Sequence, residues 1–123
     1  MKAVLSIAGS DSSGGAGIQA DIKTIAAHHL FAETVVTALT AQNTLGVAAV
    51  HDVPPDFIGA QIDAVFSDIR PDAVKVGMVS TVGAIEAIAQ GLSRWDASSI
   101  VVDPVMVATS GARLIDEDAI RAL

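Results

Sequence analysis

The sequence predicts an α/β protein in which helices cover a mostly parallel β-sheet. Short runs of apolar and β-branched residues alternate with segments whose apolar residues recur at helical spacing. Strands and helices that alternate in this way form βαβ units, in which neighbouring strands run parallel and the connecting helices pack on the faces of the sheet. The chain has 123 residues, which is enough for one domain with a single core.

The first predicted strand covers residues 3–8, an apolar run that suits a strand buried on both faces. The loop GSDSSGGAG at residues 9–17 separates this strand from a helix. Such a loop suits the close approach of a ligand to the backbone, but it equally suits a tight turn without a ligand. The helix that follows has apolar residues at helical spacing, namely Ile18, Ile22, Ile25 and Ala26.

β-branched residues predict a second strand at residues 34–40, and the polar residues 42–44 follow it. Residues 47–53 fit either a further short strand or a flap. A helix then begins at the two prolines and the aspartate of residues 54–56, and Pro71 marks its end. The apolar stripe of this helix consists of Ile58, Ile62, Val65, Phe66 and Ile69.

Two more strands are predicted in the second half of the chain, at residues 73–78 and 99–103. Between them, Thr81 is a suitable N-cap for a helix with the apolar residues Ile85, Ile88, Ala89 and Leu92. Asp116 opens a last helical stretch, residues 117–123. Because the sequence stops within about two turns of that helix, we expect a chain that is cut rather than finished.

The charge and composition argue against several classes of protein. The net charge is −7 and there is no run of Lys or Arg, whereas nucleic acids and anionic membranes require a basic surface. No apolar stretch approaches the roughly 20 residues of a membrane span, and Asp11 comes too early for a secretory signal. The chain has no cysteine. We therefore expect a cytoplasmic protein that binds neither nucleic acid nor membranes.

Residues that suit a ligand site follow the predicted strands, whose carboxyl ends are where α/β sheets bind ligands. Gln42 offers a donor and an acceptor, which suit a heterocycle edge with an amino group beside a ring nitrogen, although it also suits an ordinary turn. The Asp103 carboxylate suits either a Mg²⁺ or phosphate site or a loop cap. Met78 suits the core, and Asp21, in the first turn of its helix, suits a partner of the helix dipole.

Five segments of the sequence carry a resemblance to a known family. They are, in order, AGSDSSGGAGIQADIKT, TALTAQNTLGV, PDFIGAQIDAVFSDI, KVGM and VVDPVMVATSG. Together they resemble the hydroxymethylpyrimidine and phosphomethylpyrimidine kinases of the ribokinase-like superfamily. The resemblance extends over essentially all 123 residues. Its most specific part is a Ser-Gly-Gly-Ala-Gly turn followed by Ile-Gln-Ala-Asp.

The resemblance implies a fold, an activity and a set of site residues. The fold is the ribokinase-like three-layer α/β/α arrangement with a mostly parallel, Rossmann-like sheet. The activity is ATP-dependent and Mg²⁺-dependent phosphorylation of 4-amino-5-hydroxymethyl-2-methylpyrimidine, and then of its monophosphate, in thiamine biosynthesis. Asp103 matches the aspartate near magnesium and the ATP phosphates. The pyrimidine pocket of the family corresponds here to Gly9, Asp21, Gln42, Met78 and Val105.

The resemblance also implies that part of the enzyme lies outside this sequence. In the family, the catalytic residue and most of the ATP site belong to the second half of a chain about twice as long. Residues 1–123 would then be the N-terminal, substrate-binding half of one kinase domain, with the catalytic residue beyond Leu123. We expect this half alone to be inactive. The full-length protein is expected to be a homodimer.

Two other functions remain open. One is a pyridoxine or pyridoxal kinase, because related enzymes share the fold and the glycine-rich loop. The other is a non-catalytic module that binds pyrimidines without transferring phosphate. The amide of Gln42, which suits an aminopyrimidine edge, favours the pyrimidine kinase over the first alternative.

Overall fold

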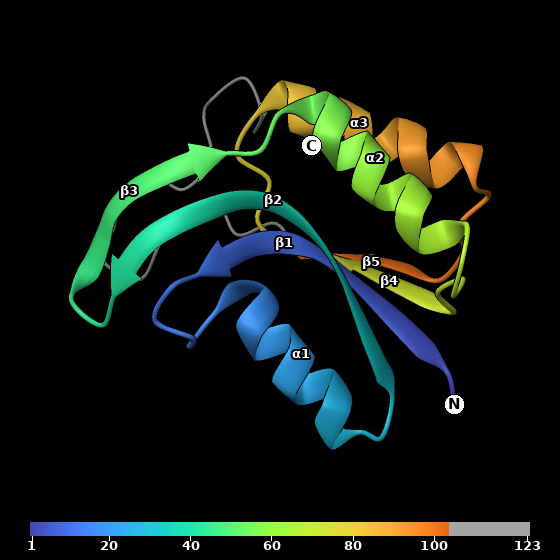
Figure 1. The fold of residues 1–123 in the computed structure, drawn as a ribbon, viewed down its shortest axis with the longest axis horizontal. Coiled ribbons are helices and arrows are strands. Elements are labelled where there is room, and N and C mark those ends of the chain that lie inside the picture. Colours follow the sequence, from blue (N-terminus) through green and yellow to red (C-terminus); the bar gives the residue numbers. More distant parts are fainter. Residues whose placement is uncertain (104–123) are drawn as a thin grey trace.

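Strand β1 (Ala3–Asp11) is the centre of a five-stranded sheet in the computed structural model, which describes residues 1–103 (Figure 1). The strand order is β3-β2-β1-β4-β5. β1 pairs in parallel with both of its neighbours, β2 (Phe31–Asn43) and β4 (Ala73–Val76), and β4 pairs in parallel with β5 (Ile100–Val102). The predicted mostly parallel sheet is therefore confirmed.

Strand β3 (Gly46–Asp52) is the one antiparallel strand of the described sheet. It folds back on the end of β2, so that Gln42 lies opposite Val47 and Asn43 opposite Gly46. Residues 47–53, for which a strand and a flap were both open, thus form mostly an edge strand. A hairpin return of this kind needs only a short connection, whereas a parallel return needs a crossover of a dozen residues or more.

The helices cover both faces of the sheet, which gives three layers (Figure 1). Helix α1 (Gly17–Ala27) packs on β1 and β2 from one side. Helices α2 (Pro55–Phe66) and α3 (Val82–Arg94) pack against each other on the opposite side. The main core lies under α2 and α3, and its fully buried members include Leu5, Ile7, Val35, Ile58 and Ile62.

The ends of several elements differ from the prediction. β1 and β2 continue through Asp11 and Asn43, beyond the apolar runs, because their backbones stay paired: Asp11 lies opposite Thr40. The strand predicted at 73–78 ends at Val76. Helix α2 ends at Phe66, so the inclusion of Ile69 in its stripe was wrong, and that side chain is 48% exposed. The N-cap of α3 is confirmed, since the Thr81 hydroxyl accepts a hydrogen bond from the Ala84 amide at 3.1 Å.

Strand β5 forms the edge of the described sheet opposite β3. All three of its residues are exposed, including Val101 at 65%. The predicted helical stretch at 117–123 and the site residue Val105 lie outside the described residues. None of the helices within residues 1–103 is long and apolar enough to span a membrane.

Candidate functional site

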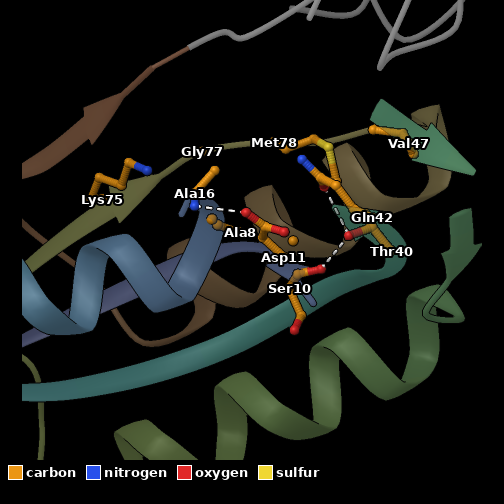
Figure 2. A pocket seen from close by; sticks show the side chains of 12 residues that line it. Ala8, Ser10, Asp11, Ala16, Thr40, Gln42, Val47, Lys75, Gly77 and Met78 are labelled. Carbon is orange, nitrogen blue, oxygen red and sulfur yellow. Dashed lines mark hydrogen bonds between the residues drawn. The ribbon is translucent and has the colours of Figure 1, made fainter. Parts of the chain in front are cut away.

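A pocket opens at the carboxyl edge of β1, β2 and β4 (Figure 2). Its cavity volume is about 160 Å³, and most of its lining is apolar. Three of the residues predicted to bind the pyrimidine lie in its wall: Gly9, Gln42 and Met78. Figure 2 shows Lys75 at one end of the pocket and Gln42 with Val47 at the other. The remaining lining residues are Ala8, Ser10, Asp11, Ala16, Gly17, Thr40 and Gly77.

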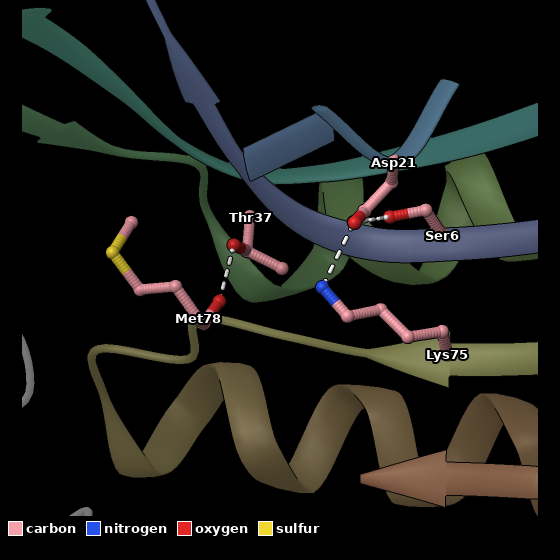
Figure 3. A network of polar contacts seen from close by, with 5 residues as sticks. All are labelled: Ser6, Asp21, Thr37, Lys75 and Met78. Atoms are coloured by element: carbon pink, nitrogen blue, oxygen red, sulfur yellow. Dashed lines mark hydrogen bonds and ion pairs between the residues drawn. The ribbon is translucent and has the colours of Figure 1, made fainter. Parts of the chain in front are cut away.

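The pocket includes the close contact between Gly9 and Met78. A β-carbon at Gly9 would overlap the terminal methyl group of Met78, so the thioether lies directly on the bare backbone of β1. The backbone carbonyl of Met78 accepts a hydrogen bond from the buried Thr37 hydroxyl at 2.9 Å (Figure 3). Met78 is thereby fixed through its backbone while its flexible side chain forms an apolar wall, which suits the face of a ring.

Gln42 lies within the last residues of β2, not after the strand as predicted. Its backbone is held by Ser12, whose hydroxyl donates to the Gln42 carbonyl at 2.6 Å and accepts from the Gln42 N–H at 2.8 Å. Its side-chain amide lies 3.0 Å from the Thr40 hydroxyl. The Thr40 hydroxyl also lies 2.8 Å from the carbonyl oxygen of Ser10. Gln42 is therefore positioned by contacts at both its backbone and its side chain.

Three amides of the glycine-rich loop are not available to a ligand, because the Asp11 carboxylate already binds them. That carboxylate accepts hydrogen bonds from the amides of Ser13, Gly15 and Ala16 at 2.8 to 3.0 Å and from the Ser13 hydroxyl at 2.7 Å. The Ser13 hydroxyl bond, together with the three amide bonds, holds the pKa of Asp11 below its usual value against the opposing effect of burial.

Gly17 closes the same loop with a φ of +57°, a left-handed conformation that favours glycine. A β-carbon at this position would overlap the carbonyl oxygen of Gly9. The close approach of the start of α1 to β1 therefore requires glycine here. As a result, the loop is a self-contained turn that also contributes backbone to the pocket wall. The approach of a ligand to this backbone stays a prediction.

Asp21 does not line the pocket but forms a polar network next to it (Figure 3). Its carboxylate accepts a hydrogen bond from the Ser6 hydroxyl at 2.6 Å and pairs with the Lys75 ammonium at 2.8 Å. The placement of Asp21 in the first turn was wrong, because α1 begins at Gly17 and has no acidic residue in its first turn. The charge of Asp21 serves the ion pair instead of the helix dipole.

Lys75 is a pocket residue that the sequence analysis missed. It lies in β4 directly opposite Ser6 of β1, and both side chains face α1, where they meet Asp21. A lysine within an otherwise apolar strand was the available signal, because a partly buried ammonium group favours an ion-pair partner. Thr40 and Ser12, which position Gln42, carried no comparable signal.

Asp103 follows β5 at the same edge of the sheet, and its backbone N–H donates to the Val76 carbonyl at 2.8 Å. Its side chain is exposed and does not belong to the pocket lining. Among residues 1–103, no group of three or more His, Asp or Glu side chains is arranged to hold a metal ion.

Comparisons with a family model and with curated sequences indicate one family. The family model described as phosphomethylpyrimidine kinase matches residues 11–123. The hydroxymethylpyrimidine/phosphomethylpyrimidine kinase of Rhizobium meliloti (strain 1021) is 60% identical over 119 residues, which make up 97% of this chain and 44% of that protein. The chain spans less than half the length of the curated relatives it matches.

Solved structures of similar proteins extend this result to the fold. The crystal structure of phosphomethylpyrimidine kinase from Clostridium difficile 630 superimposes with a TM-score of 0.91 and 51% identity, and the match covers 97% of this chain and 52% of that one. An ADP complex of Bacillus subtilis pyridoxal kinase gives a TM-score of 0.79 and 40% identity, over 87% of this chain and 41% of that one. The ribokinase-like fold implied by the sequence resemblance is confirmed.

Proposed function

Because the chain belongs to the phosphomethylpyrimidine kinase family, we propose that it forms the substrate-binding half of an ATP-dependent hydroxymethylpyrimidine/phosphomethylpyrimidine kinase. The substrate is 4-amino-5-hydroxymethyl-2-methylpyrimidine, which is phosphorylated on its hydroxymethyl oxygen, followed by its monophosphate. Residues 1–123 correspond to the N-terminal half of one kinase domain. We place the catalytic residue and most of the ATP site in the second half of the longer protein, so the chain alone transfers no phosphate.

The observation that supports this proposal most is the meeting of Gly9, Gln42 and Met78 in one cavity. These residues come from three different strand ends, and the resemblance assigned all three to the pyrimidine. An apolar wall with a few polar groups at its rim is what a small heteroaromatic ring requires. Met78 and the bare backbone at Gly9 cover the face of the ring, while the Gln42 amide contacts its edge.

Asp21 acts on this pocket through Lys75 in our proposal. Asp21 holds the ammonium group at the rim, and Lys75 carries the positive charge that the ligand meets. Because an ammonium has three donors, the bond to Asp21 leaves two for the ligand or for water. Val105, the fifth residue assigned to the pyrimidine by resemblance, remains a prediction.

Asp103 is the residue we assign to the Mg²⁺-ATP side of the site. Magnesium bound to ATP takes most of its ligands from phosphates and water, so one exposed carboxylate at the sheet edge suits it. When bound, ATP supplies the phosphoryl group and Mg²⁺ neutralises the charge of its phosphates. The contribution of the described residues is to hold the pyrimidine in a fixed orientation at the same edge of the sheet.

Calorimetric titration of the chain with the aminopyrimidine, with pyridoxine in parallel, tests the proposal. We expect the pyrimidine to bind more tightly, and Gln42→Ala to weaken it by about tenfold, the loss of roughly one hydrogen bond. Gln90→Ala, at an exposed position on α3, is the matched control and should bind as the parent does. Equal binding of the two rings, or no binding by a folded chain, would contradict the proposal.

The second candidate function is that of a pyridoxine or pyridoxal kinase, and the structural similarity to Bacillus subtilis pyridoxal kinase supports it. The same titration separates the two, since a pyridoxal kinase would prefer pyridoxine. A module that binds the pyrimidine without catalysis would differ in that a full-length chain, supplied with Mg²⁺-ATP, would leave the bound ring unphosphorylated. A homodimer of the full-length protein remains a prediction.

A further inference from the structure

The Thr40 hydroxyl lies within hydrogen-bond distance of two oxygen atoms. One is the Ser10 carbonyl oxygen at 2.8 Å, and the other is the side-chain oxygen assigned to Gln42 at 3.0 Å. A hydroxyl has one hydrogen and can donate to only one of them. The other contact would then bring two lone pairs together without a hydrogen between them.

The Ser10 carbonyl and the Gln42 amide differ in their ability to donate a hydrogen bond. A backbone carbonyl can only accept, whereas a glutamine amide can turn over and present its NH₂ group in place of its oxygen with almost no change of shape. Both contacts are satisfied in one arrangement alone: Thr40 donates to the Ser10 carbonyl, the shorter contact, and accepts from the Gln42 amide nitrogen.

Building on the proposed function, we propose that Thr40 is a positioning residue that orients the Gln42 amide with its oxygen toward the ligand. The far end of that amide lies in the pocket wall, pointing away from Thr40 (Figure 2). An amide oxygen accepts and cannot donate, so this edge of the pocket selects a ring that presents a donor, such as an exocyclic amine. The nitrogen keeps a second hydrogen for a neighbouring ring nitrogen.

Thr40 can set this orientation because the backbone of Gln42 is already fixed. Ser12 holds both backbone polar groups of Gln42, and β3 pairs with Gln42 opposite Val47. The remaining freedom of Gln42 lies in its side-chain torsions, and within residues 1–103 its amide has one hydrogen-bond partner, the Thr40 hydroxyl. Selectivity at the pocket therefore depends on a residue two positions before the one that contacts the ligand.

A hydrogen-exchange measurement tests the orientation without any ligand. In ¹⁵N-labelled chain, we expect one side-chain amide hydrogen of Gln42 to exchange with water more slowly than those of the exposed Gln90. Thr40→Val, which removes the hydroxyl but keeps the shape, should abolish this protection, and Thr40→Ser should retain it. Exchange at Gln42 that equals exchange at Gln90, or that does not respond to Thr40→Val, would overturn the proposal.

A binding comparison then tests the selectivity. The aminopyrimidine should bind at least about tenfold more tightly than its 4-oxo analogue, in which an acceptor replaces the amine. Thr40→Val should reduce that ratio by several-fold while Thr40→Ser preserves it. A preference for the 4-oxo analogue, or a ratio insensitive to Thr40→Val, would overturn the proposal. If neither ring binds, the proposed function fails, and the exchange measurement still decides the orientation.

Discussion

The Ser12 hydroxyl bonds to both backbone polar groups of Gln42, donating to its carbonyl at 2.6 Å and accepting from its N–H at 2.8 Å. These residues are 30 positions apart, and the pair joins the loop after β1 to the end of β2. Strand β1 ends at Asp11 and supplies no further backbone hydrogen bonds to β2. The Ser12 hydroxyl takes the place of that backbone partner.

Removal of the Ser12 hydroxyl should therefore weaken ligand binding more than it weakens the fold. We expect Ser12→Ala to lower the affinity for the aminopyrimidine about fivefold, the equivalent of roughly one net hydrogen bond. Ser98→Ala changes an exposed serine away from the pocket and serves as the control. Calorimetric titration measures the affinity of both variants, and equal affinities for the two would contradict this role of Ser12.

Gly17→Ala should destabilise the protein strongly. The substitution combines a left-handed φ of +57° with overlap between the new β-carbon and the Gly9 carbonyl oxygen. The left-handed conformation alone costs about 1 to 2 kcal/mol for an L-residue, so we expect a total loss of more than about 2 kcal/mol in the free energy of unfolding.

Gly59→Ala is a matched control for that substitution. Gly59 lies within α2, and a β-carbon there would meet open space. Replacement should raise the free energy of unfolding by about 0.5 to 1 kcal/mol, because alanine favours the helix. Urea unfolding of the two variants and the parent gives the comparison. Equal stability of the Gly17→Ala variant and the parent would show that the loop can move away from β1.

Asp11→Asn should destabilise the protein at neutral pH and less so in acid. The hydrogen bonds from Ser13 and the loop amides lower the pKa of Asp11, so its stabilising effect is complete above the unfolded value near 3.8 and is lost as the pH falls through the lower folded value. At pH 7 we expect a loss of about 2 kcal/mol, typical of hydrogen bonds to a charged group.

Urea unfolding of this variant and the parent at pH 7, 5 and 3 measures the difference. The difference in the free energy of unfolding between the two proteins should be constant from pH 7 to pH 5 and smaller at pH 3. A stability difference that increases in acid would mean that the Asp11 carboxylate does not have the hydrogen-bond partners described for it.

Glu33→Gln should stabilise the protein at neutral pH. One carboxylate oxygen of Glu33 is buried and has no hydrogen-bond partner in residues 1–103. Burial, and to a smaller extent the negative charges of Asp68 and Asp72, raise the pKa of Glu33. The stabilising effect of the protonated form is present below the unfolded pKa of 4.5 and is lost as the pH rises through the higher folded pKa.

A glutamine at position 33 is neutral and avoids that loss of stability. The stability gained by Glu33→Gln should therefore be largest at pH 7 and should vanish toward pH 4. Thermal unfolding at pH 7, 5.5 and 4 measures it. Glu86→Gln, at an exposed position on α3, should show no such pH dependence. An advantage of Glu33→Gln that persists unchanged at pH 4 would point to packing as its cause.

Asp21→Asn and Lys75→Met should have coupled effects on binding. If Asp21 acts by holding Lys75, Asp21→Asn should lower the affinity only slightly further in a protein that already carries Lys75→Met. We expect each single variant to lower the affinity for the aminopyrimidine about tenfold and the double variant to lower it by much less than a hundredfold, as in other contacting pairs. Calorimetric titration of the cycle measures this coupling. Additive effects would instead indicate that Asp21 contacts the ligand by itself.

Part of the site could be predicted because its position depends on topology alone. Gly9, Gln42 and Met78 each stand near the carboxyl end of a strand, and parallel strands bring those ends to one edge whatever the intervening loops do. The course of the loop at residues 12–16 could not be predicted in the same way. Whether its amides face a ligand or an internal carboxylate depends on backbone conformation, and the same residues suit both.

The role of Asp21 depends on contacts far apart in the sequence. Asp21 and Lys75 are separated by 54 positions, and they meet because Ser6 and Lys75 are register partners on the face that α1 covers. No local pattern contains that register. The ends of β1 and β2 were missed for a related reason, since backbone pairing extends the strands past the apolar residues that identify them.

The internal carboxylate in the first loop also affects the charge of the ligand that the proposed pocket suits. Asp11 and Asp21 bring two negative charges to the pocket and its surroundings, and Lys75 brings one positive charge. A loop whose amides already surround Asp11 has no vacant positive concavity for a second anion. Under the proposed function, we therefore expect the ring to bind in a neutral or protonated form, and a phosphate carried by that ring to point away from the loop and toward Lys75 or the edge beyond it.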